Sequence, residues 1–214
     1  KSLDKTKCSN VRIAGLNIFV QMSLNILLGC TGSVATIKVP ELVDCLKKKW
    51  NNANIRLVLT KNSEFFLTKV LKETTSKVEW YKDVDEWKDW KHIGDPILHI
   101  NLSKWADIFL ICPLDANTMA KLATGLCDNL LTCICRAWDF KKPIIVAPAM
   151  NTLMWQNPLS SQHVALLTQL GYFFIYPITK LLACGDTGIG AMEEVSLIVE
   201  FVYQHIQKFN IINH

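Results

Sequence analysis

Short apolar runs alternate with longer amphipathic stretches along most of the chain. The runs are rich in Ile, Leu, Val and Phe, and they predict strands buried on both faces of a parallel sheet. They cover residues 24–28, 54–60, 107–112, 144–146 and 172–176, and a further short strand follows residue 78. The segments between them carry apolar residues at helical spacing. Right-handed crossovers through such helices predict an α/β fold in three layers, with a doubly wound, Rossmann-like or flavodoxin-like parallel sheet of about six strands.

Proline, glycine and lysine mark where the predicted helices begin and end. Pro40 falls inside a helical pattern, so we expect a kink or a restart at Pro40-Glu41. Lys47-Lys48-Lys49 indicate a helix end, where cations suit the helix dipole. Gly171 ends the helix that precedes the last strand, and residues 193–208 form an amphipathic helix that closes the chain.

Two stretches of the chain predict less regular structure. Residues 78–96 interleave acidic residues with tryptophans, which predicts a short strand and then an excursion. There Glu86, Trp87 and Trp90 would form a surface helix or cover a subunit boundary, and no chemistry is predicted for them. Residues 181–192 are rich in glycine and have the length of a loop that acts as a mobile lid.

Length and composition indicate one domain. With 214 residues, 50% of them hydrophobic, the chain is large enough for one sizeable core and short for two. We expect residues 1–22 to be an N-terminal extension and residues 23–214 to be a single domain. Residues 13–30 carry no formal charge, but Asn17, Gln21 and Ser23 argue against a membrane span. We therefore expect a soluble, cytoplasmic protein that does not bind membranes.

Charge and cysteine content exclude some classes of function. The 23 basic and 19 acidic residues give a net charge of only +4, with no long basic stripe, so nucleic acid is not an expected partner. The chain has eight cysteines, but Cys112, Cys127, Cys133 and Cys135 lie in apolar segments, which favours reduced, buried thiols over a disulfide framework. Cys133 and Cys135 lack a second ligand pair, so no metal site is expected.

Polar or glycine-rich turns, among them the polar loop Thr60-Lys61-Asn62-Ser63, follow several predicted strands, where open α/β sheets bind ligands. Gly29 to Ala35 join a strand to a helix and could cradle a phosphate, although the turn lacks both G-x-G-x-x-G and the P-loop lysine. Pro148 ends one predicted strand, so we expect Met150, Asn151 and Met154 at the turn that follows it. Residue type alone favours a helix cap for Asn151 and a core position for His99. Polar turns at several strand ends indicate a cofactor-binding protein.

Several motifs, taken together and in order, resemble a known family. They are Gly32-Ser33-Val34-Ala35, Ile97-Leu98-His99-Ile100, Pro113-Leu114-Asp115-Ala116-Asn117-Thr118, Pro148-Ala149-Met150-Asn151-x-x-Met154-Trp155 and Ala183-Cys184-Gly185-Asp186. The chain from about Leu24 onward is similar to the homo-oligomeric flavin-containing cysteine decarboxylases. Within that family it resembles the enzymes that convert 4′-phosphopantothenoylcysteine to 4′-phosphopantetheine in coenzyme A biosynthesis.

The resemblance implies a homotrimer that binds FMN between subunits, and a two-stage reaction. FMN would oxidise the substrate's CH₂–SH group to a thioaldehyde, which serves as the electron sink for decarboxylation. Reduced FMN would then return hydride to the resulting ene-thiolate. By the same resemblance, His99 is an active-site residue contributed across a subunit boundary, Asn151 holds the substrate carboxylate, and Cys184 donates a proton in the reductive half.

The resemblance also implies which residues bind the two small molecules. FMN would contact Gly32, Ser33, Val34, Thr60, Lys61, Asn62, Phe66, Asp115, Ala116, Asn117, Thr118 and Ala149. The substrate would contact Asn151, Met154, Leu181, Leu182, Ala183 and Met192. One position departs from the family pattern, because Leu181 stands where a basic residue is expected, and Lys180 is the candidate substitute.

Three other functions are also compatible with the sequence. A peptidyl-cysteine decarboxylase of the same fold would stop at the ene-thiol and would need no Cys184. A protein phosphatase regulatory subunit would resemble family members that have lost a catalytic residue, whereas this chain keeps His99, Asn151 and Cys184. A simple electron-transfer flavoprotein would not require the pair of His99 and Cys184.

Overall fold

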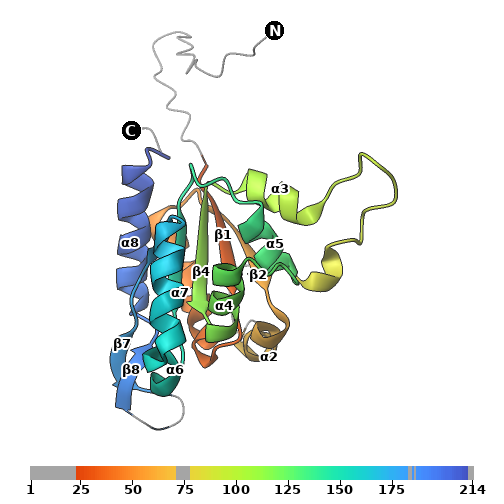
Figure 1. Ribbon diagram of the computed structural model, residues 1–214. Coiled ribbons are helices and arrows are strands. Elements are labelled where there is room, and N and C mark those ends of the chain that lie inside the picture. Colours follow the sequence, from red (N-terminus) through yellow and green to blue (C-terminus); the bar gives the residue numbers. More distant parts are fainter. Residues whose placement is uncertain (1–22, 71–77, 183–184, 186, 212–214) are drawn as a thin grey trace, which may run out of the picture.

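The computed structural model describes residues 23–70, 78–182, 185 and 187–211. Its centre is a six-stranded parallel sheet in the order β3-β2-β1-β4-β5-β6 (Figure 1). The strands are β1 (Asn25–Cys30), β2 (Asn54–Leu59), β3 (Glu79–Tyr81), β4 (Ile108–Leu114), β5 (Ile144–Pro148) and β6 (Tyr172–Phe174). The prediction of an α/β fold around a parallel sheet of about six strands is confirmed.

Helices and short 3₁₀ turns connect the strands. The helices are α1 (Val39–Lys49), α2 (Lys61–Val70), α3 (Leu98–Trp105), α4 (Ala116–Thr124), α5 (Leu130–Arg136), α6 (Thr152–Gln156), α7 (Pro158–Gln169) and α8 (Val195–Lys208). The 3₁₀ turns are η1 (Val34–Lys38) and η3 (Asp83–Asp85). Pro40 lies in the first turn of α1, directly after η1, so the restart predicted there is confirmed.

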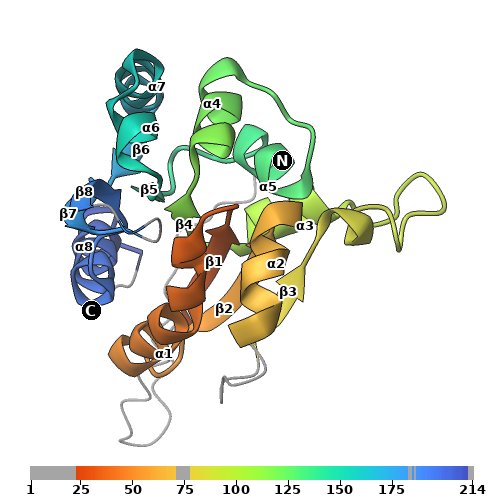
Figure 2. The same cartoon turned by 90° about the horizontal axis from the view of Figure 1, so that it is seen from below.

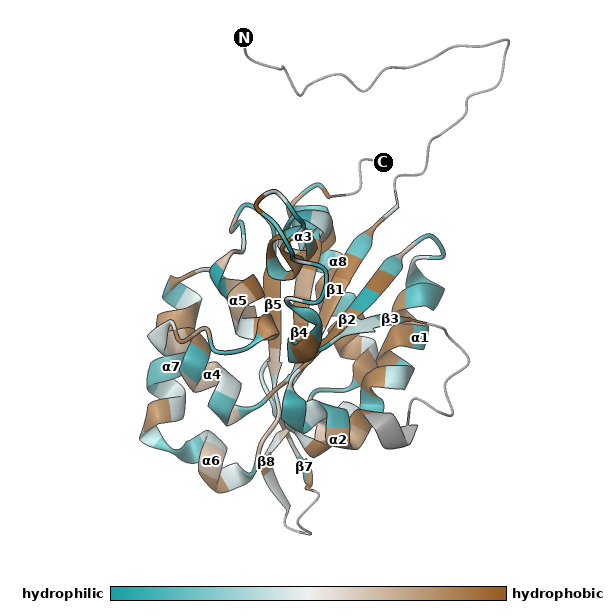
Figure 3. Cartoon of the chain, turned by 90° about the vertical axis from the view of Figure 1, so that its right-hand side faces the viewer, coloured by the Kyte–Doolittle hydropathy of each residue, from teal (hydrophilic) through white to brown (hydrophobic). Residues whose placement is uncertain are grey.

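The sheet is buried on both faces, which gives the molecule three layers. One core contains Ile26 and Leu28 of β1 together with side chains of α1 and α8. The second contains Leu27 and Phe109 together with side chains of α3, α4, α5 and α7. Figure 2 shows α1 and α8 on one side of the sheet and α4 and α5 on the other, while Figure 3 shows the mixed hydropathy of the covering helices. Burial of both faces explains the nearly continuous apolar runs of the strands.

Two predicted loops are ordered differently in the structure. Residues 181–192 were expected to form a loop, but β7 (Ile178–Leu181) and β8 (Thr187–Ala191) form an antiparallel pair. Short strands that contain glycine lack the apolar run by which strands are recognised. Lys61, Asn62 and Ser63 belong to the first turn of α2 rather than to a loop, and the Thr60 carbonyl accepts hydrogen bonds from Ser63 and Glu64.

The excursion after β3 holds no surface helix. Within the described residues 78–97 the helical element is the η3 turn, and the following residues are irregular. Trp87 and Trp90 meet edge to face with ring centroids 6.5 Å apart, and both are exposed. The predicted N-terminal extension, residues 1–22, lies outside the described residues. Among the described helices, none has the length and apolar character needed to cross a membrane.

Candidate functional site

The carboxyl ends of β1 and β4 are tied together at the point where the strand order reverses direction. The Thr31 hydroxyl donates to the Pro113 carbonyl over 2.8 Å and accepts from the Asp115 amide over 2.6 Å. Asp115 in turn accepts from the Gly32 amide at Oδ2 over 2.9 Å and from the Thr118 amide at Oδ1 over 2.6 Å. The turn of Gly32 is therefore fixed by bonds within the chain, at the place where open α/β sheets bind ligands.

Gly32 lies at the closest approach of three segments. A Cβ atom at this position would lie 2.7 Å from the Cβ of Asn62 and 2.9 Å from Oδ2 of Asp115. Neither neighbour has room to move, because Asn62 is in the first turn of α2 and Asp115 caps α4. Only glycine fits this space, and the backbone of the turn is left open on its other side.

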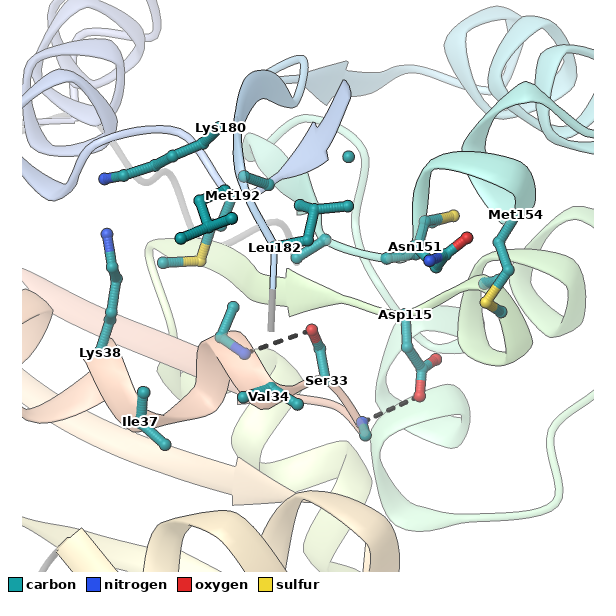
Figure 4. A pocket seen from close by; sticks show the side chains of 18 residues that line it. Ser33, Val34, Ile37, Lys38, Asp115, Asn151, Met154, Lys180, Leu182 and Met192 are labelled. Carbon is teal, nitrogen blue, oxygen red and sulfur yellow. Dashed lines mark hydrogen bonds between the residues drawn. The ribbon is translucent and has the colours of Figure 1, made fainter. Parts of the chain in front are cut away.

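A cavity of about 540 Å³ opens beside this turn, and its walls come from distant parts of the chain (Figure 4). It brings together many of the predicted site residues, namely Gly32, Ser33, Val34, Asp115, Ala116, Ala149, Asn151, Met154, Leu181, Leu182 and Met192. The remaining lining residues are Ala35, Ile37, Lys38, Met150, Lys180, Gly190 and Ala191. A mostly apolar cavity with a few polar groups is typical of a small-molecule site.

Other predicted contacts lie outside the cavity wall. Thr60, Lys61, Asn62, Phe66, Asn117 and Thr118 are not among its lining residues. Some of them support it from behind, since the Thr60 amide donates to the Cys30 carbonyl and Thr118 contacts Asp115. Ala183 and Cys184 lie outside the described residues.

The P-A-M-N-x-x-M-W motif supplies one wall of the cavity. Asn151 caps α6, because its Oδ1 accepts a hydrogen bond from the Leu153 amide over 2.9 Å, and its side chain also lines the cavity. The helix-cap interpretation is therefore confirmed without excluding a ligand contact. The antiparallel pair of β7 and β8, called the β7-β8 hairpin below, contacts this motif. The Met150 amide donates a 2.9 Å hydrogen bond to the Gly190 carbonyl of β8.

Two lysines on the cavity wall share one carboxylate. Lys180 Nζ donates to Glu194 Oε1 over 2.6 Å, and Lys38 Nζ lies 3.5 Å from Oε2. The hydrogen bond with Glu194 raises the pKa of Lys180, and the contacts with Lys180 and then Lys38 lower the pKa of Glu194. Two lysine side chains face one carboxylate here, so this wall carries a net positive charge. Sequence reasoning missed Lys38, which η1 presents to the cavity one turn after Ser33-Val34.

His99 is not brought to this cavity within one chain. It lies in the first turn of α3, and Figure 1 shows α3 at the opposite end of the sheet from α6, β7 and β8. Its Nδ1 is 2.5 Å from Oε1 of Glu86, a buried carboxylate for which the sequence suggested no chemistry. A lone glutamate among exposed tryptophans and acidic residues gives no signal in the sequence that it is buried.

Two of the four thiols that were predicted to be buried, Cys112 and Cys135, are buried, and so is Cys30. Burial raises the pKa of Cys30, and raises that of Cys112 to about 12, so both thiols stay protonated beneath the site. The prediction is wrong for Cys127, which is exposed in the turn between α4 and α5, and for Cys133, which is only partly buried.

Comparison with known proteins agrees with these features. The family model described as Flavoprotein matches residues 21–207. A phosphopantothenoylcysteine decarboxylase of Arabidopsis thaliana is 54% identical over 177 residues, which cover 83% of this chain and 82% of the relative.

Two solved structures extend the comparison. A PPC decarboxylase mutant complexed with pantothenoylaminoethenethiol aligns with a TM-score of 0.82 and 51% identity, covering 87% of this chain and 100% of the other. The FMN binding protein AtHal3 aligns with a TM-score of 0.79 and 51% identity, covering 87% and 98%. The chain therefore belongs to the flavoprotein family that includes the phosphopantothenoylcysteine decarboxylases.

Proposed function

We propose that the chain is a phosphopantothenoylcysteine decarboxylase that uses FMN and acts in coenzyme A biosynthesis. One observation carries the proposal: a single cavity joins the Gly32 turn, the Asp115 cap and the P-A-M-N-x-x-M-W motif. These elements come from β1, β4 and β5, which are neighbours in the sheet. Relatives of about 50% identity indicate which substrate to expect, and the cavity offers a site where it could bind.

The residues of the cavity fit FMN. Gly32 lets its turn pack tightly against Asn62 and Asp115 while it lines the cavity. The cavity volume suits a tricyclic ring. Ser33, Val34, Asp115, Ala116 and Ala149 line the cavity and would hold the cofactor. When bound, FMN would supply the redox chemistry, accepting two electrons from the substrate's CH₂–SH group and later returning them. The apolar wall keeps water away from that exchange.

The substrate would lie against the opposite wall. Asn151 would orient the substrate carboxylate by hydrogen bonding, and Met154, Leu181, Leu182 and Met192 would enclose the pantothenoyl arm. Met192 is buried, with its Sδ 3.3 Å from the Cys112 thiol, so this part of the wall packs directly against β4. Ala183 and Cys184 follow Leu182 directly in the chain, and Cys184 would donate the proton to the ene-thiolate.

Lys180 replaces the basic residue that the family pattern places at Leu181. Lys180 and Lys38 line the same cavity, and their shared partner Glu194 balances one of their two charges. The wall is therefore suited to a phosphate group, whose oxygens accept hydrogen bonds from ammonium groups.

The position of His99 supports a homotrimer with shared active sites. His99 would act at the cavity of a neighbouring subunit, because within one chain it is not among the residues that line the cavity. In a closed cyclic trimer, each subunit would place its own His99 at one neighbour's cavity. Its own cavity would receive His99 from the other neighbour. The six cysteines of the described residues are free thiols, which fits the reducing cytoplasm.

Two measurements test the proposed reaction. The purified protein should be yellow and should release FMN on denaturation. Incubation with 4′-phosphopantothenoylcysteine should give 4′-phosphopantetheine, identified by mass spectrometry. A colourless protein that FMN does not reconstitute, or a yellow protein that leaves the substrate unchanged, would contradict the proposal.

Replacement of Cys184 separates this activity from that of a peptidyl-cysteine decarboxylase. Cys184→Ser should consume the substrate and accumulate the decarboxylated ene-thiol, which is two hydrogens lighter than the normal product. Reduction of the ene-thiol fails because serine is a much weaker proton donor than cysteine. Cys127→Ser, at an exposed thiol away from the cavity, is the control and should form 4′-phosphopantetheine normally. Normal product from Cys184→Ser would remove Cys184 from this role.

A further inference from the structure

Glu86 is buried in a segment whose other residues are exposed or partly exposed. Every residue from 78 to 101 is described, and Glu86 is the one buried residue among them, with 8% of its surface exposed. Its amide donates to the Asp83 carbonyl, and the Asp83 carboxylate accepts from the Leu130 amide at the start of α5 over 2.9 Å. The backbone at Glu86 is therefore anchored to a helix of the core.

Burial of a carboxylate needs a compensating partner, and His99 is that partner. Oε1 of Glu86 lies 2.5 Å from Nδ1 of His99, while Oε2 is buried without a hydrogen-bond partner among the described residues. A buried carboxylate that lost its hydrogen bond would be strongly destabilised. The carboxylate therefore holds the ring, because turning His99 away would leave both Glu86 oxygens unpaired.

The contact also determines which ring nitrogen of His99 is available. A carboxylate accepts hydrogen bonds, so Nδ1 carries the proton and Nε2 takes no part in this contact. The His99 side chain keeps 21% of its surface exposed, so part of the ring is accessible from outside the chain. The arrangement matches the general pattern in which a carboxylate fixes the tautomer and orientation of a working imidazole.

We propose that Glu86 is a positioning residue, which fixes the ring of His99 so that Nε2 is presented to the active site of the adjoining subunit. This inference rests on the proposed function, since it takes His99 as an active-site residue. Glu86 itself would touch neither substrate nor FMN.

Glu86→Gln tests the role with little change in shape. In the FMN-loaded enzyme we expect kcat to fall about 10-fold to 100-fold, as for other residues that orient an active imidazole, with KM and FMN content unchanged. Asp89→Asn removes a negative charge from an exposed position of the same segment and should behave like the unmodified enzyme.

A readout independent of activity comes from NMR of ¹⁵N-histidine-labelled protein, with His99→Asn used to assign the signal. The unmodified protein should show His99 protonated at Nδ1. In Glu86→Gln the signal should move toward the other tautomer, because an amide can donate as well as accept. If Glu86→Gln fails to fold, Glu86→Asp keeps the charge with a shorter reach, and it should retain the Nδ1 proton with lowered kcat.

Unchanged kcat and unchanged His99 nitrogen shifts in Glu86→Gln would overturn the proposal. So would a lowered melting temperature accompanied by the wild-type tautomer, since that result would make Glu86 a structural anchor only. Absence of decarboxylase activity in the unmodified protein would instead refute the proposed function, while the nitrogen shifts would still show whether Glu86 sets the tautomer of His99.

Discussion

At the scale of single residues, the site uses polar side chains that also hold the fold. Asp115 accepts backbone hydrogen bonds from both Gly32 and Thr118, and Asn151 caps α6 while it lines the cavity. Such side chains are already fixed before a ligand arrives, which favours precise positioning. It also means that their replacement would affect stability and binding together.

Lys180 offers a cleaner test of binding because it is exposed. Lys180→Leu should raise the KM for 4′-phosphopantothenoylcysteine about 10-fold, since a hydrogen bond to a charged group contributes about 1.5 kcal/mol. Steady-state kinetics with the unphosphorylated substrate should show no such rise. Lys49→Leu removes a comparable lysine at the far end of α1, paired with Glu200 at 3.4 Å, and serves as the control. An equal rise for both substrates would contradict a phosphate contact.

The lowered pKa of His205 should make the stability of the protein depend on pH. Burial lowers its pKa below the usual 6.5, and its ring packs between Phe173 and Phe201 with centroids 4.5 Å and 4.3 Å away. As the pH falls below 6.5, the unfolded chain binds a proton at His205 more readily than the folded chain does, so stability is lost.

The free energy of unfolding should therefore decrease between pH 7.5 and pH 5.5, as measured by urea denaturation. His205→Gln should reduce this slope, because it removes a group that protonates mainly in the unfolded chain. His92→Gln, at a side chain that is 85% exposed, should leave the slope unchanged. A slope that His205→Gln does not alter would assign the pH dependence to other groups.

Part of the candidate site could be predicted from sequence motifs, and part of it could not. Asn151, Met154 and the Gly32 turn stand in motifs whose spacing is read directly from the chain. Lys38 and Glu86 do not, because their roles depend on distant partners, Glu194 and His99, that only the folded chain brings near. Burial of a charged residue is a tertiary property, and local sequence carries no signal for it.

At the scale of elements, the β7-β8 hairpin depends on close backbone contact. Gly190 has a φ of 140°, and a Cβ atom there would overlap the Met150 carbonyl oxygen. Gly190→Ala should destabilise the protein by about 1–3 kcal/mol through this strain and should weaken substrate binding, because the hairpin carries Lys180 and Leu181. Thermal denaturation and KM measure the two effects.

Gly94→Ala provides a matched comparison for Gly190→Ala. Gly94 also has a positive φ, of 105°, but a Cβ atom there would meet nothing within 4 Å. Its replacement should cost backbone strain alone and leave KM unchanged. If both variants lower stability equally and neither alters KM, docking of the hairpin on Met150 is unimportant.

Elements with a strong periodic pattern were predicted and those without one were not. Five strands of the parallel sheet, all except β3, follow from apolar runs, and the restart at Pro40 follows from proline chemistry. The hairpin was mistaken for a loop because its order comes from pairing and docking rather than from burial of an apolar run. The surface helix considered for Glu86, Trp87 and Trp90 does not form, since the η3 turn ends at Asp85 and the next residues are irregular.

At the scale of the whole molecule, shared sites predict complementation between inactive variants. His99→Asn and Asn151→Ala should each be inactive alone. After the two are mixed, unfolded and refolded together, about one quarter of the sites should combine both normal residues if subunits assemble at random. Activity of the mixture measures this recovery, and sedimentation should report three chains per particle. Recovery of no activity, with both variants folded and assembled, would contradict a site built from two subunits.

The bracing of Thr31, Gly32 and Asp115 bears on how the enzyme acquires its cofactor. These bonds lie wholly within the chain, so the mouth of the cavity has its shape before anything enters. A binding site that is already ordered loses little conformational entropy when its ligand binds. Stripped protein should therefore take up flavin in a single fast phase without refolding, and its circular dichroism should be the same before and after.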